Sequence, residues 1–449
     1  MLLARELAIA PDPPAIARRL LAARARGVAL LHTADRPAPG LPGPGRWSYV
    51  AAEPDLVSRR LDPIADDPAP ILTGTGAGPL AFTPRWIGVV PYEGRRSLLE
   101  RPAWAGPDAR PQVRPVDPFW YRYPAVVCID HLADRVILAG TDAAAVEHLA
   151  GLLAAAAPAE PTLAIDVADE EPPARHAERI AAAKELILKG DLYQVNLARR
   201  LAIRLRDGDP LALYLSLSRH APSAFGACLH LEGEVTVVST SPELLLRAHP
   251  APESAASSQG FGALFTVPIK GTRPRGADPA EDAALARELD HDPKEIAELT
   301  MIVDVERNDL GRIAELGSIR VTAGPMVVTH RTLHHRLALL EARTRAGVSR
   351  EQVLAAMIPS GSVTGAPKVR AMEVIARLEA ARRGLYTGGL GFVGHDGGVT
   401  MAMAIRTAVL EGREGSYWTG GGIVADSDPA REVEETRWKA LQLMRAAGG

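Results

Sequence analysis

Lys270 is the residue in this chain whose surroundings most suggest covalent chemistry. It lies in a turn-rich stretch, with Pro268 before it and Gly271 after it. A lysine amine that loses part of its hydration has a lowered pKa and becomes nucleophilic. The same stretch also suits a surface lysine in a basic turn, because Arg273 and Arg275 follow closely. The local sequence therefore leaves both interpretations open.

Two predicted helices each carry a pair of glutamates three residues apart. The first pair is Glu295 and Glu298, and the second is Glu432 and Glu435. Residues at this spacing share one face of a helix. Mg²⁺ prefers a few carboxylates together with water and an anionic ligand, so one glutamate from each helix would suit this ion. Both pairs could equally be solvated helix faces.

Two further segments could hold a small anionic molecule. The segment Trp418–Ala425 contains three consecutive glycines after a predicted strand, and their backbone amides would be open to a carboxylate. Arg406 and Lys439 could add positive charge. The segment Pro359–Lys368 is expected to form a structured turn in which Ser362 can hydrogen-bond a substrate. Neither segment has a nucleotide-binding pattern, and the glycines could also form a plain turn.

The composition excludes several kinds of partner. The chain has 449 residues and a net charge of −3, which gives no reason to expect a nucleic-acid partner. Cys128 and Cys228 each lie in an apolar stretch, which predicts reduced thiols in the core. The sequence shows no signal peptide and no apolar run of about 20 residues, so we expect a cytoplasmic enzyme.

Regular patterns of secondary structure become clear beyond a segment rich in alanine, proline and acidic residues, 154–175, which we interpret as a linker. Residues 176–189 have apolar side chains at helical spacing, and Gly190 is expected to end that helix. Strands are predicted at 226–231 and 235–240.

Capping signals mark the start of both glutamate-bearing helices. Asp292, Pro293 and Glu295 supply an N-cap, a first-turn proline and an N3 glutamate in that order. Asp428 and Pro429 mark the second start. Because helices and strands do not alternate regularly along the chain, the sequence predicts an α+β fold.

Taken together and in this order, these segments belong to a series of blocks that resembles the chorismate-utilising enzymes. That family includes anthranilate synthase component I, aminodeoxychorismate synthase component I, and the isochorismate and salicylate synthases. The matching blocks are Tyr193–Ala198, Thr240–Glu243, Pro268–Arg275, Met301–Asp304, Arg307–Arg312, Gly365–Lys368, Ala404–Thr407, Gly420–Ser427, Glu435–Thr436 and Lys439.

The resemblance implies a fold and a division of the chain. The fold is a large two-sheet antiparallel β-sandwich flanked by helices. Residues 1–165 would form an N-terminal region of the component I type, and residues 176–445 a chorismate-binding catalytic region. Within the first region, Gly45–Tyr49 is similar to a family segment near a small pocket that holds tryptophan in some members.

Two positions separate the members of this family. Isochorismate and salicylate synthases have a lysine that activates water at the position of Gln194, and a glutamine cannot act as that base. Anthranilate synthases usually have alanine at the position of Lys270, whereas aminodeoxychorismate synthases have lysine there. Both positions favour amination of chorismate at C4, in the branch that leads to p-aminobenzoate and folate.

The resemblance also implies a role for each site residue. Lys270 would attack C2 of chorismate while Glu243 acts as the general acid for departure of the C4 hydroxyl. Mg²⁺ would be held by Glu298 and Glu435, with Glu295 and Glu432 around them. The residues implied in substrate binding are Gly271, Thr272, His335, Ser362, Tyr386, Arg406, Gly421, Gly422 and Lys439.

The chain departs from the family pattern in two places. Arg336, Leu337 and Ala338 stand where Leu-Val-Ser is usual after His335, which bears on the role of that histidine. The segment that joins Glu243 to Lys270 also looks longer than is typical, which bears on the geometry of the pair.

The ammonia would come from a partner. Neither cysteine lies in a nucleophile elbow, so we expect a separate glutaminase subunit, or free ammonium, to supply it. Two alternatives remain: the chain is an anthranilate synthase component I, or it is a non-catalytic homologue that binds chorismate.

Overall fold

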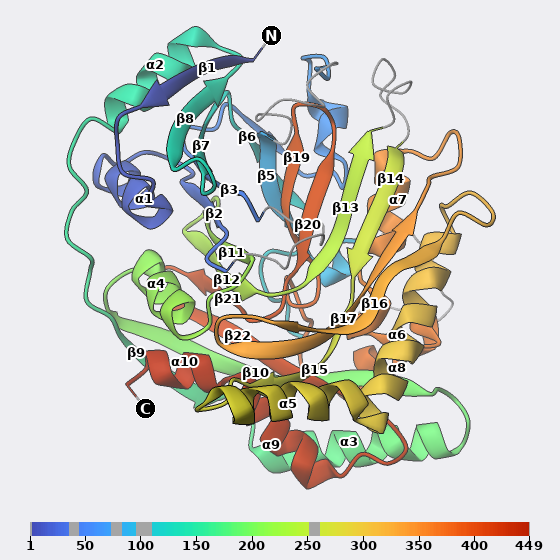
Figure 1. The fold of residues 1–449 in the computed structure, drawn as a ribbon. Coiled ribbons are helices and arrows are strands. Elements are labelled where there is room, and N and C mark those ends of the chain that lie inside the picture. The colour runs from blue at the N-terminus through green and yellow to red at the C-terminus, as the bar shows by residue number, and fades with distance from the viewer. Residues whose placement is uncertain (1, 36–44, 73–82, 96–109, 251–260, 449) are drawn as a thin grey trace.

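Two large antiparallel sheets form the centre of the molecule, and helices cover their outer faces (Figure 1). The computed structural model describes residues 2–35, 45–72, 83–95, 110–250 and 261–448, and every element below lies within these ranges. The expected α+β fold, an antiparallel β-sandwich flanked by helices, is confirmed.

The first sheet contains 12 of the described strands. Across the sheet they are β1 (Leu3–Leu7), β8 (Arg135–Gly140), β7 (Ala125–Asp130), β3 (Trp47–Ala51), β2 (Ala29–His32), β11 (Phe225–His230), β12 (Val235–Ser241), β21 (Thr407–Glu411), β22 (Glu414–Ile423), β10 (Gln194–Asp207) and β18 (Gly365–Ala366), while β9 (Ala164–Asp169) also pairs with β10. Because β2 pairs directly with β11, the N-terminal strands extend the same sheet that carries the later ones.

The second sheet contains 10 described strands. In order they are β15 (Ile269–Pro274), β17 (Leu333–Ala342), β14 (Phe261–Val267), β13 (Leu244–Pro250), β20 (Val399–Met403), β19 (Gly389–Gly394), β5 (Pro84–Val90), β6 (Phe119–Arg122) and β4 (Leu56–Ser58), while β16 (Arg320–Thr329) also pairs with β17. A cluster of buried side chains that includes Tyr49, Cys128, Val89 and Phe392 fills the space between the two sheets.

Helices complete the layers. They are α1 (Pro13–Ala22), α2 (Ala143–Leu152), α3 (Pro173–Leu188), α4 (Pro210–His220), α5 (Pro279–His291), α6 (Pro293–Gly311), α7 (Arg350–Met357), α8 (Lys368–Leu378), α9 (Pro429–Lys439) and α10 (Leu441–Ala446), with short 3-10 turns η1 (Pro63–Asp66), η2 (Tyr92–Arg95) and η3 (Gly361–Val363). The apolar sides of α1, α2, α4 and α10 pack on the first sheet, and those of α6 and α7 pack on the second. None of the described helices is long and apolar enough to cross a membrane.

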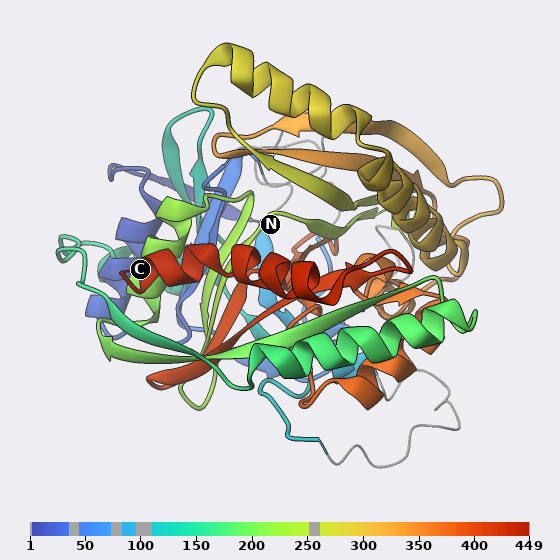
Figure 2. The ribbon, with the colours of Figure 1, turned by 90° about the horizontal axis from the view of Figure 1, so that it is seen from below.

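The predicted helix starts are confirmed. The carboxylate of Asp292 caps α6 by accepting the backbone N–H of Lys294 at 2.9 Å. Asp428 caps α9 by accepting the N–H of Arg431 at 3.0 Å. Gly190, with a φ of +83°, follows the end of α3 as expected. Figure 2 shows α9 crossing the lower face of the molecule, with α3 along one side and α5 and α6 on the other.

The expected linker 154–175 is wrong in its central part, because it contains strand β9. Ile165 is buried and Asp166 is exposed, so the strand alternates between the two sides of the sheet. Alanines and acidic residues obscured that period in the composition. The strand is stabilised by pairing with β10, in a register that places Ile165 opposite Leu205, forty residues later in the chain.

Both cysteines are buried and free, as predicted. Burial raises the pKa of Cys128 to about 12. A thiol with such a pKa stays protonated near neutral pH and is a poor nucleophile. The cysteines therefore belong to the core.

Candidate active site

A bulge in strand β15 presents Lys270. Ile269 pairs with Leu337 and Thr272 with His335, so two residues of β15, Lys270 and Gly271, lie opposite one residue of β17. Bulges of this kind redirect a side chain and often occur beside active sites. The lysine interacts electrostatically with two carboxylates, one from Glu243 and one from Glu435.

Gly271 is required by this bulge. Its φ is +86°, in the left-handed region that favours glycine. A Cβ at this position would lie 2.8 Å from Cδ1 of Leu289 and 3.0 Å from Oε2 of Glu295. The glycine therefore allows β15 to run close against the start of α6.

Glu243 is a buried acid at the junction of β12 and β13. Ser362 donates its hydroxyl to Oε1 of Glu243 at 3.1 Å, and the backbone N–H of Ile269 also donates to this carboxyl. Burial raises the pKa of Glu243 to about 7, although Lys270 and Arg406 act in the opposite direction. A carboxylic acid with this pKa can hold and release a proton near neutral pH.

The carboxyl of Glu243 and the amine of Lys270 interact although a long segment of chain separates these residues. Residues 251–260, where that segment differs from the family pattern, lie outside the described residues. The strands on either side, β13 and β14, pair with each other, with Leu244 opposite Val267. This pairing places the residues next to Glu243 beside those that lead into β15.

The side-chain amide of Gln194 is buried without hydrogen-bond partners. Gln194 is fully buried, and neither Oε1 nor Nε2 of its amide is hydrogen-bonded to any described residue. The amide lies over β22, where Nε2 would be 3.0 Å from a Cβ added at Gly422. Buried polar atoms in folded proteins nearly always have partners, so this arrangement indicates a place where a polar molecule binds.

His335 faces the same region. Its Nδ1 is 3.0 Å from Oγ1 of Thr272, while its buried Nε2 has no partner among the described residues. Burial, together with Arg406, holds the pKa of His335 well below its ordinary value, so the ring is neutral. His334 instead bonds to Thr329 and Asp282 on the other side of the strand. The adjacent histidines therefore act as separate hydrogen-bonding groups, on opposite sides of the strand.

The four predicted glutamates gather around one amine. Burial lowers the pKa of Lys294 in α6, but Glu298, Glu432, Glu435 and Glu295 together raise it above its ordinary value. Nζ of Lys294 lies 3.7 Å from Oε1 of Glu298. The facing ends of α6 and α9 therefore form an acidic pocket that attracts a cation.

The acidic pocket has unequal members. Nζ of Lys439 lies 2.6 Å from Oε1 of Glu435. Burial raises the pKa of Glu435, but Lys439, Lys270 and Lys294 outweigh it and the net shift is downward. Burial raises the pKa of Glu432, which accepts a hydrogen bond from Ser427 at 2.7 Å.

Oxygen donors of this kind suit Mg²⁺. Within the described part of the chain, no three His, Cys, Asp or Glu residues are arranged to hold a metal ion by themselves. Mg²⁺ commonly binds one or two protein carboxylates and completes its shell with water and a substrate anion. The donor set of the acidic pocket fits such an ion.

The glycine segment differs from the expectation in one respect. Gly421 and Gly422 do not follow a strand but lie inside β22, where they pair with Leu197 and Asn196 of β10. On its other edge β22 pairs with β21 only as far as Tyr417. Beyond that residue, every second backbone amide of β22 points away from β10, toward the edge that β21 leaves unpaired. A Cβ at Gly421 would lie 3.3 Å from Glu432 and 3.5 Å from Glu435. The glycines thus let β22 approach the acidic pocket.

The remaining predicted residues flank this centre. Arg406 interacts electrostatically with Glu243. Its backbone lies in the left-handed region, with a φ of +50°. Nζ of Lys439 donates to the carbonyl oxygen of Gly420 at 2.9 Å. Tyr386 stacks on Trp418 with ring centroids 5.6 Å apart, and its described contacts do not reach Lys270. The structure therefore brings together all the predicted groups except Tyr386, which lies at the margin.

Three residues of this centre were not predicted. Lys294 lies just after the predicted N-cap Asp292 but was not proposed for the site, and neither were Ser360 and Glu306. The hydroxyl of Ser360 is within hydrogen-bond distance of both Glu306 and Ser362 and can donate to one of them while accepting from the other. The spacing of Ser360 and Ser362 is a weak signal, and no local pattern marks Glu306, because it meets the serines only through the fold.

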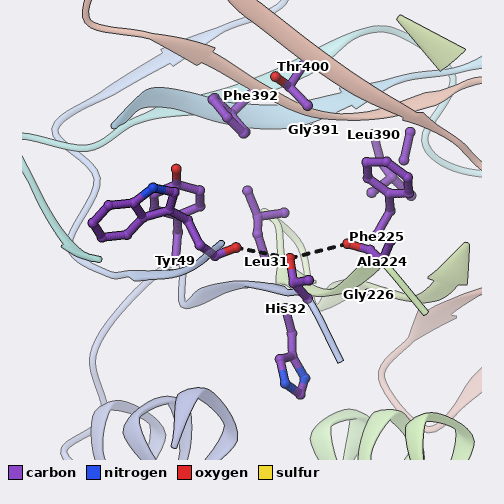
Figure 3. A pocket seen from close by; sticks show the side chains of 13 residues that line it. Leu31, His32, Tyr49, Ala224, Phe225, Gly226, Leu390, Gly391, Phe392 and Thr400 are labelled. Carbon is purple, nitrogen blue, oxygen red and sulfur yellow. Dashed lines mark hydrogen bonds between the residues drawn. The ribbon is translucent and has the colours of Figure 1, made fainter. Parts of the chain in front are cut away.

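A second cavity lies between the sheets and is lined by Trp47, Tyr49, Phe392 and neighbouring residues of both sheets (Figure 3). Oγ1 of Thr33 donates to the carbonyl oxygen of Trp47 at 2.9 Å. The ring of His32 points away from the cavity and pairs with the hydroxyl of Tyr214 at 2.8 Å. The side chains of Thr33 and His32 are thus already engaged, and the cavity presents a mainly apolar wall.

Comparisons with known proteins agree with this geometry. The family model described as "chorismate binding enzyme" matches residues 51–445. Anthranilate synthase component 1 of Streptomyces coelicolor is 37% identical over 434 residues, covering 90% of this chain and 81% of that protein. Aminodeoxychorismate synthase of Streptomyces griseus is 42% identical over 266 residues, which cover 59% of this chain but 35% of that protein.

A solved structure extends the likeness to the whole fold. Anthranilate synthase component I from Streptococcus pneumoniae superimposes with a TM-score of 0.75 at 27% identity, covering 89% of this chain and 92% of that one. The match includes both sheets, since so large a share of each chain is aligned. This chain belongs to the family of chorismate-binding enzymes.

Proposed function

We propose that this protein aminates chorismate at C4 to form 4-amino-4-deoxychorismate, using ammonia supplied by a separate glutaminase subunit. The observation that carries the proposal is the position of Lys270. The bulge in β15 sets its amine between the buried acid Glu243 and the acidic pocket of α6 and α9. A nucleophile between a proton donor and a substrate-anchoring site is the arrangement that this reaction needs.

In the first half of the reaction, Lys270 acts as the nucleophile. Its amine forms a bond to C2 of chorismate, the ring double bond shifts, and the C–O bond at C4 breaks. Glu243 gives its proton to the departing hydroxyl, which leaves as water. The raised pKa of Glu243 supports this role, because a substantial fraction of the acid is protonated at neutral pH.

In the second half, ammonia forms a bond to C4 and Lys270 leaves C2 as a free amine. The new ammonium group returns a proton to Glu243, so that chorismate and ammonia give aminodeoxychorismate and water. Gln194, with its unpartnered buried amide, is placed to hydrogen-bond the ring or the incoming ammonia but cannot take a proton from water.

Other residues would position the substrate. Glu298 and Glu435 would hold Mg²⁺, with Glu295 and Glu432 beside them, and the ion supplies positive charge for the ring carboxylate when it is bound. The groups proposed to orient the substrate and its carboxylates are Gly271, Thr272, His335, Ser362, Tyr386, Arg406, Gly421, Gly422 and Lys439. Arg406 and Lys439 contribute the local positive charge that a dianionic substrate needs in a protein with a net charge of −3.

A second candidate function is anthranilate synthesis. It is favoured by the Streptomyces coelicolor relative, which matches nearly the whole chain. In that reaction chorismate and ammonia give anthranilate, pyruvate and water. Lys270 argues against it, because a nucleophilic lysine at this position fits a reaction in which ammonia enters at C4.

Product analysis tests the proposal. The protein is incubated with chorismate, Mg²⁺ and ammonium, and the products are identified by mass spectrometry alongside an enzymatic assay for pyruvate. The expected product retains the enolpyruvyl group, with no pyruvate released. Anthranilate with an equal amount of pyruvate would overturn the proposal, and binding of chorismate without turnover would identify a non-catalytic homologue.

A further inference from the structure

Glu306 is a buried carboxyl that the proposed reaction does not use. It lies on α6 and is 1% exposed. Its Oε1 is hydrogen-bonded to the hydroxyl of Ser360, whereas its Oε2 has no partner among the described residues. A buried carboxylate without a cation of its own is strongly disfavoured, so this position stabilises the protonated form.

A continuous chain of hydrogen bonds links this carboxyl to Glu243. Oγ of Ser360 is 3.0 Å from Oγ of Ser362, and Oγ of Ser362 is 3.1 Å from Oε1 of Glu243. Both hydroxyls are buried, and the 3-10 turn η3 holds them on the same side. The backbone N–H of Ser362 also donates to Oγ of Ser360 at 3.0 Å, which fixes the first hydroxyl in place.

Counting hydrogens shows which protonation state this chain suits. With one proton on the two carboxyls, each hydroxyl donates once along the chain and every link is made. With no proton, both hydroxyls donate outward and the link between Ser360 and Ser362 holds no hydrogen. With two protons, one hydroxyl hydrogen has no acceptor. The geometry thus favours one proton shared by two acids.

The charged groups around the pair allow this sharing. Glu306 faces Asp309 on its own helix, Lys368 of α8, and Glu243. Nζ of Lys368 is 2.7 Å from Oδ2 of Asp309, so this cation is directed to the aspartate. Glu243 faces Lys270 and Arg406. Burial and the neighbouring Asp309 raise the pKa of Glu306 to about 8, close to that of Glu243.

We propose that Glu306 is a positioning residue that shares one proton with Glu243 through Ser360 and Ser362 and so keeps Glu243 able to donate. This inference rests on the proposed function of Glu243 as general acid. While the shared proton is on Glu306, Glu306 passes it to Ser360, Ser360 passes one to Ser362, and Ser362 passes one to Glu243, so that Glu243 holds the proton that it then gives to the leaving hydroxyl. The proton that the C4 ammonium later returns to Glu243 travels back along the same path, so no proton is gained or lost over the cycle.

The first test is the pH profile of the Glu306→Gln variant. Chorismate consumption is measured across pH at constant free ammonia, which reports turnover whichever amino product forms. Two coupled acids retain their last proton to higher pH than either acid alone. We expect the alkaline limb of kcat/KM to move to lower pH, with a loss of about tenfold at the alkaline end and little change in acid.

The control is Ser223→Ala, which removes a buried hydroxyl that has no described partner and is not part of the chain of hydrogen bonds. It should leave the pH profile in place. An unchanged alkaline limb in a folded Glu306→Gln variant would overturn the proposal. If that variant does not fold, Ser360→Ala keeps both carboxyls and interrupts the chain, and it should move the limb in the same direction.

Infrared spectroscopy separates this inference from the proposed function. The band of protonated carboxyls is recorded for the wild-type protein, Glu306→Gln and Glu243→Gln at neutral pH without chorismate. One shared proton predicts that the band of the wild-type protein is altered in both variants. A band that changes in one variant and not in the other would refute the sharing, even if the protein turns over a different substrate.

Discussion

The two acidic regions beside Lys270 are built from the same side chain and behave in opposite ways. Glu243 is enclosed between the sheets and has a serine hydroxyl and a backbone amide as its hydrogen-bond donors. Glu435 is about half-exposed and lies 2.6 Å from an amine. The pKa of Glu243 is raised to about 7, whereas that of Glu435 is lowered.

This difference assigns different chemistry to the two sides of the site. On the enclosed side, burial disfavours the charged carboxylate, so the group is suited to donating a proton. In the acidic pocket, nearby lysines outweigh burial at Glu435, so this carboxylate stays charged and is suited to binding a cation. Lys270 contributes to both environments, because it interacts electrostatically with Glu243 and with Glu435.

Removing the residue common to both regions should have the largest effect. We expect Lys270→Ala to lower chorismate turnover by more than about 10³-fold and to abolish any covalent adduct, since a nucleophile has no substitute. Turnover is measured with ammonium, and the adduct by intact-protein mass spectrometry. Arg275→Ala, directly after the end of β15 and paired with Asp282 at 2.7 Å, is the control. Turnover of Lys270→Ala at the wild-type rate would exclude the nucleophilic role.

Changing the enclosed acid should have the next largest effect. Glu243→Gln keeps the shape and the hydrogen bond from Ser362 but cannot release a proton, so we expect a loss of about 10²- to 10⁴-fold. In the wild-type protein the active form of Glu243 is protonated, and turnover should fall as pH rises through about 7. The measurement is kcat/KM for chorismate across pH at constant free ammonia. A variant that keeps the wild-type profile would show that another group donates the proton.

The sequence identified these two regions better than it identified their connection. The N-cap residues Asp292 and Asp428 are local signals, so the starts of α6 and α9 and the position of their glutamates could be predicted. The identity of Lys270 was also accessible, from its place among the family blocks. The bulge that presents it was not, because it depends on the register between β15 and a strand more than sixty residues later.

Contacts between distant residues were the part that the sequence could not supply. Ser360 meets Glu306 across 54 residues of chain, and no periodicity in either segment indicates this contact. The strand β9 was missed for a related reason, since its pairing with β10 decides its structure more than its own composition does. Local patterns thus predicted which side chains are candidates for the site, whereas the register of the strands decides which of them come into contact.

The acidic pocket should respond to metal. We expect Glu298→Gln and Glu435→Gln each to weaken binding of Mg²⁺ at least about tenfold, because each removes one charged oxygen donor. Binding is followed directly by titration with Mn²⁺ and electron paramagnetic resonance, and excess Mg²⁺ should restore part of the turnover. Glu434→Gln is the matched control on α9, where Glu434 is exposed and pairs with Arg437. Equal ion affinity in all three variants would place the metal elsewhere.

The smallest expected effect concerns stability, and its sign differs between the two regions. Because the folded pKa of Glu243 is raised, its stabilising contribution is complete below about pH 4.5 and is lost as pH rises through about 7. At pH 8, Glu243→Gln should therefore melt at a higher temperature than the wild-type protein, with a free energy of unfolding larger by roughly 3 kcal/mol at most. Near pH 4 the two proteins should melt at similar temperatures.

The lowered pKa of Glu435 gives the opposite sign, since its contribution is present at neutral pH and is lost in acid. Glu435→Gln should then melt slightly lower at pH 8, with a difference that vanishes at low pH and is reduced by solvent screening. Thermal unfolding of both variants at the two pH values measures this contrast, and shifts of the same sign would mean that burial and the lysines do not separate the two regions.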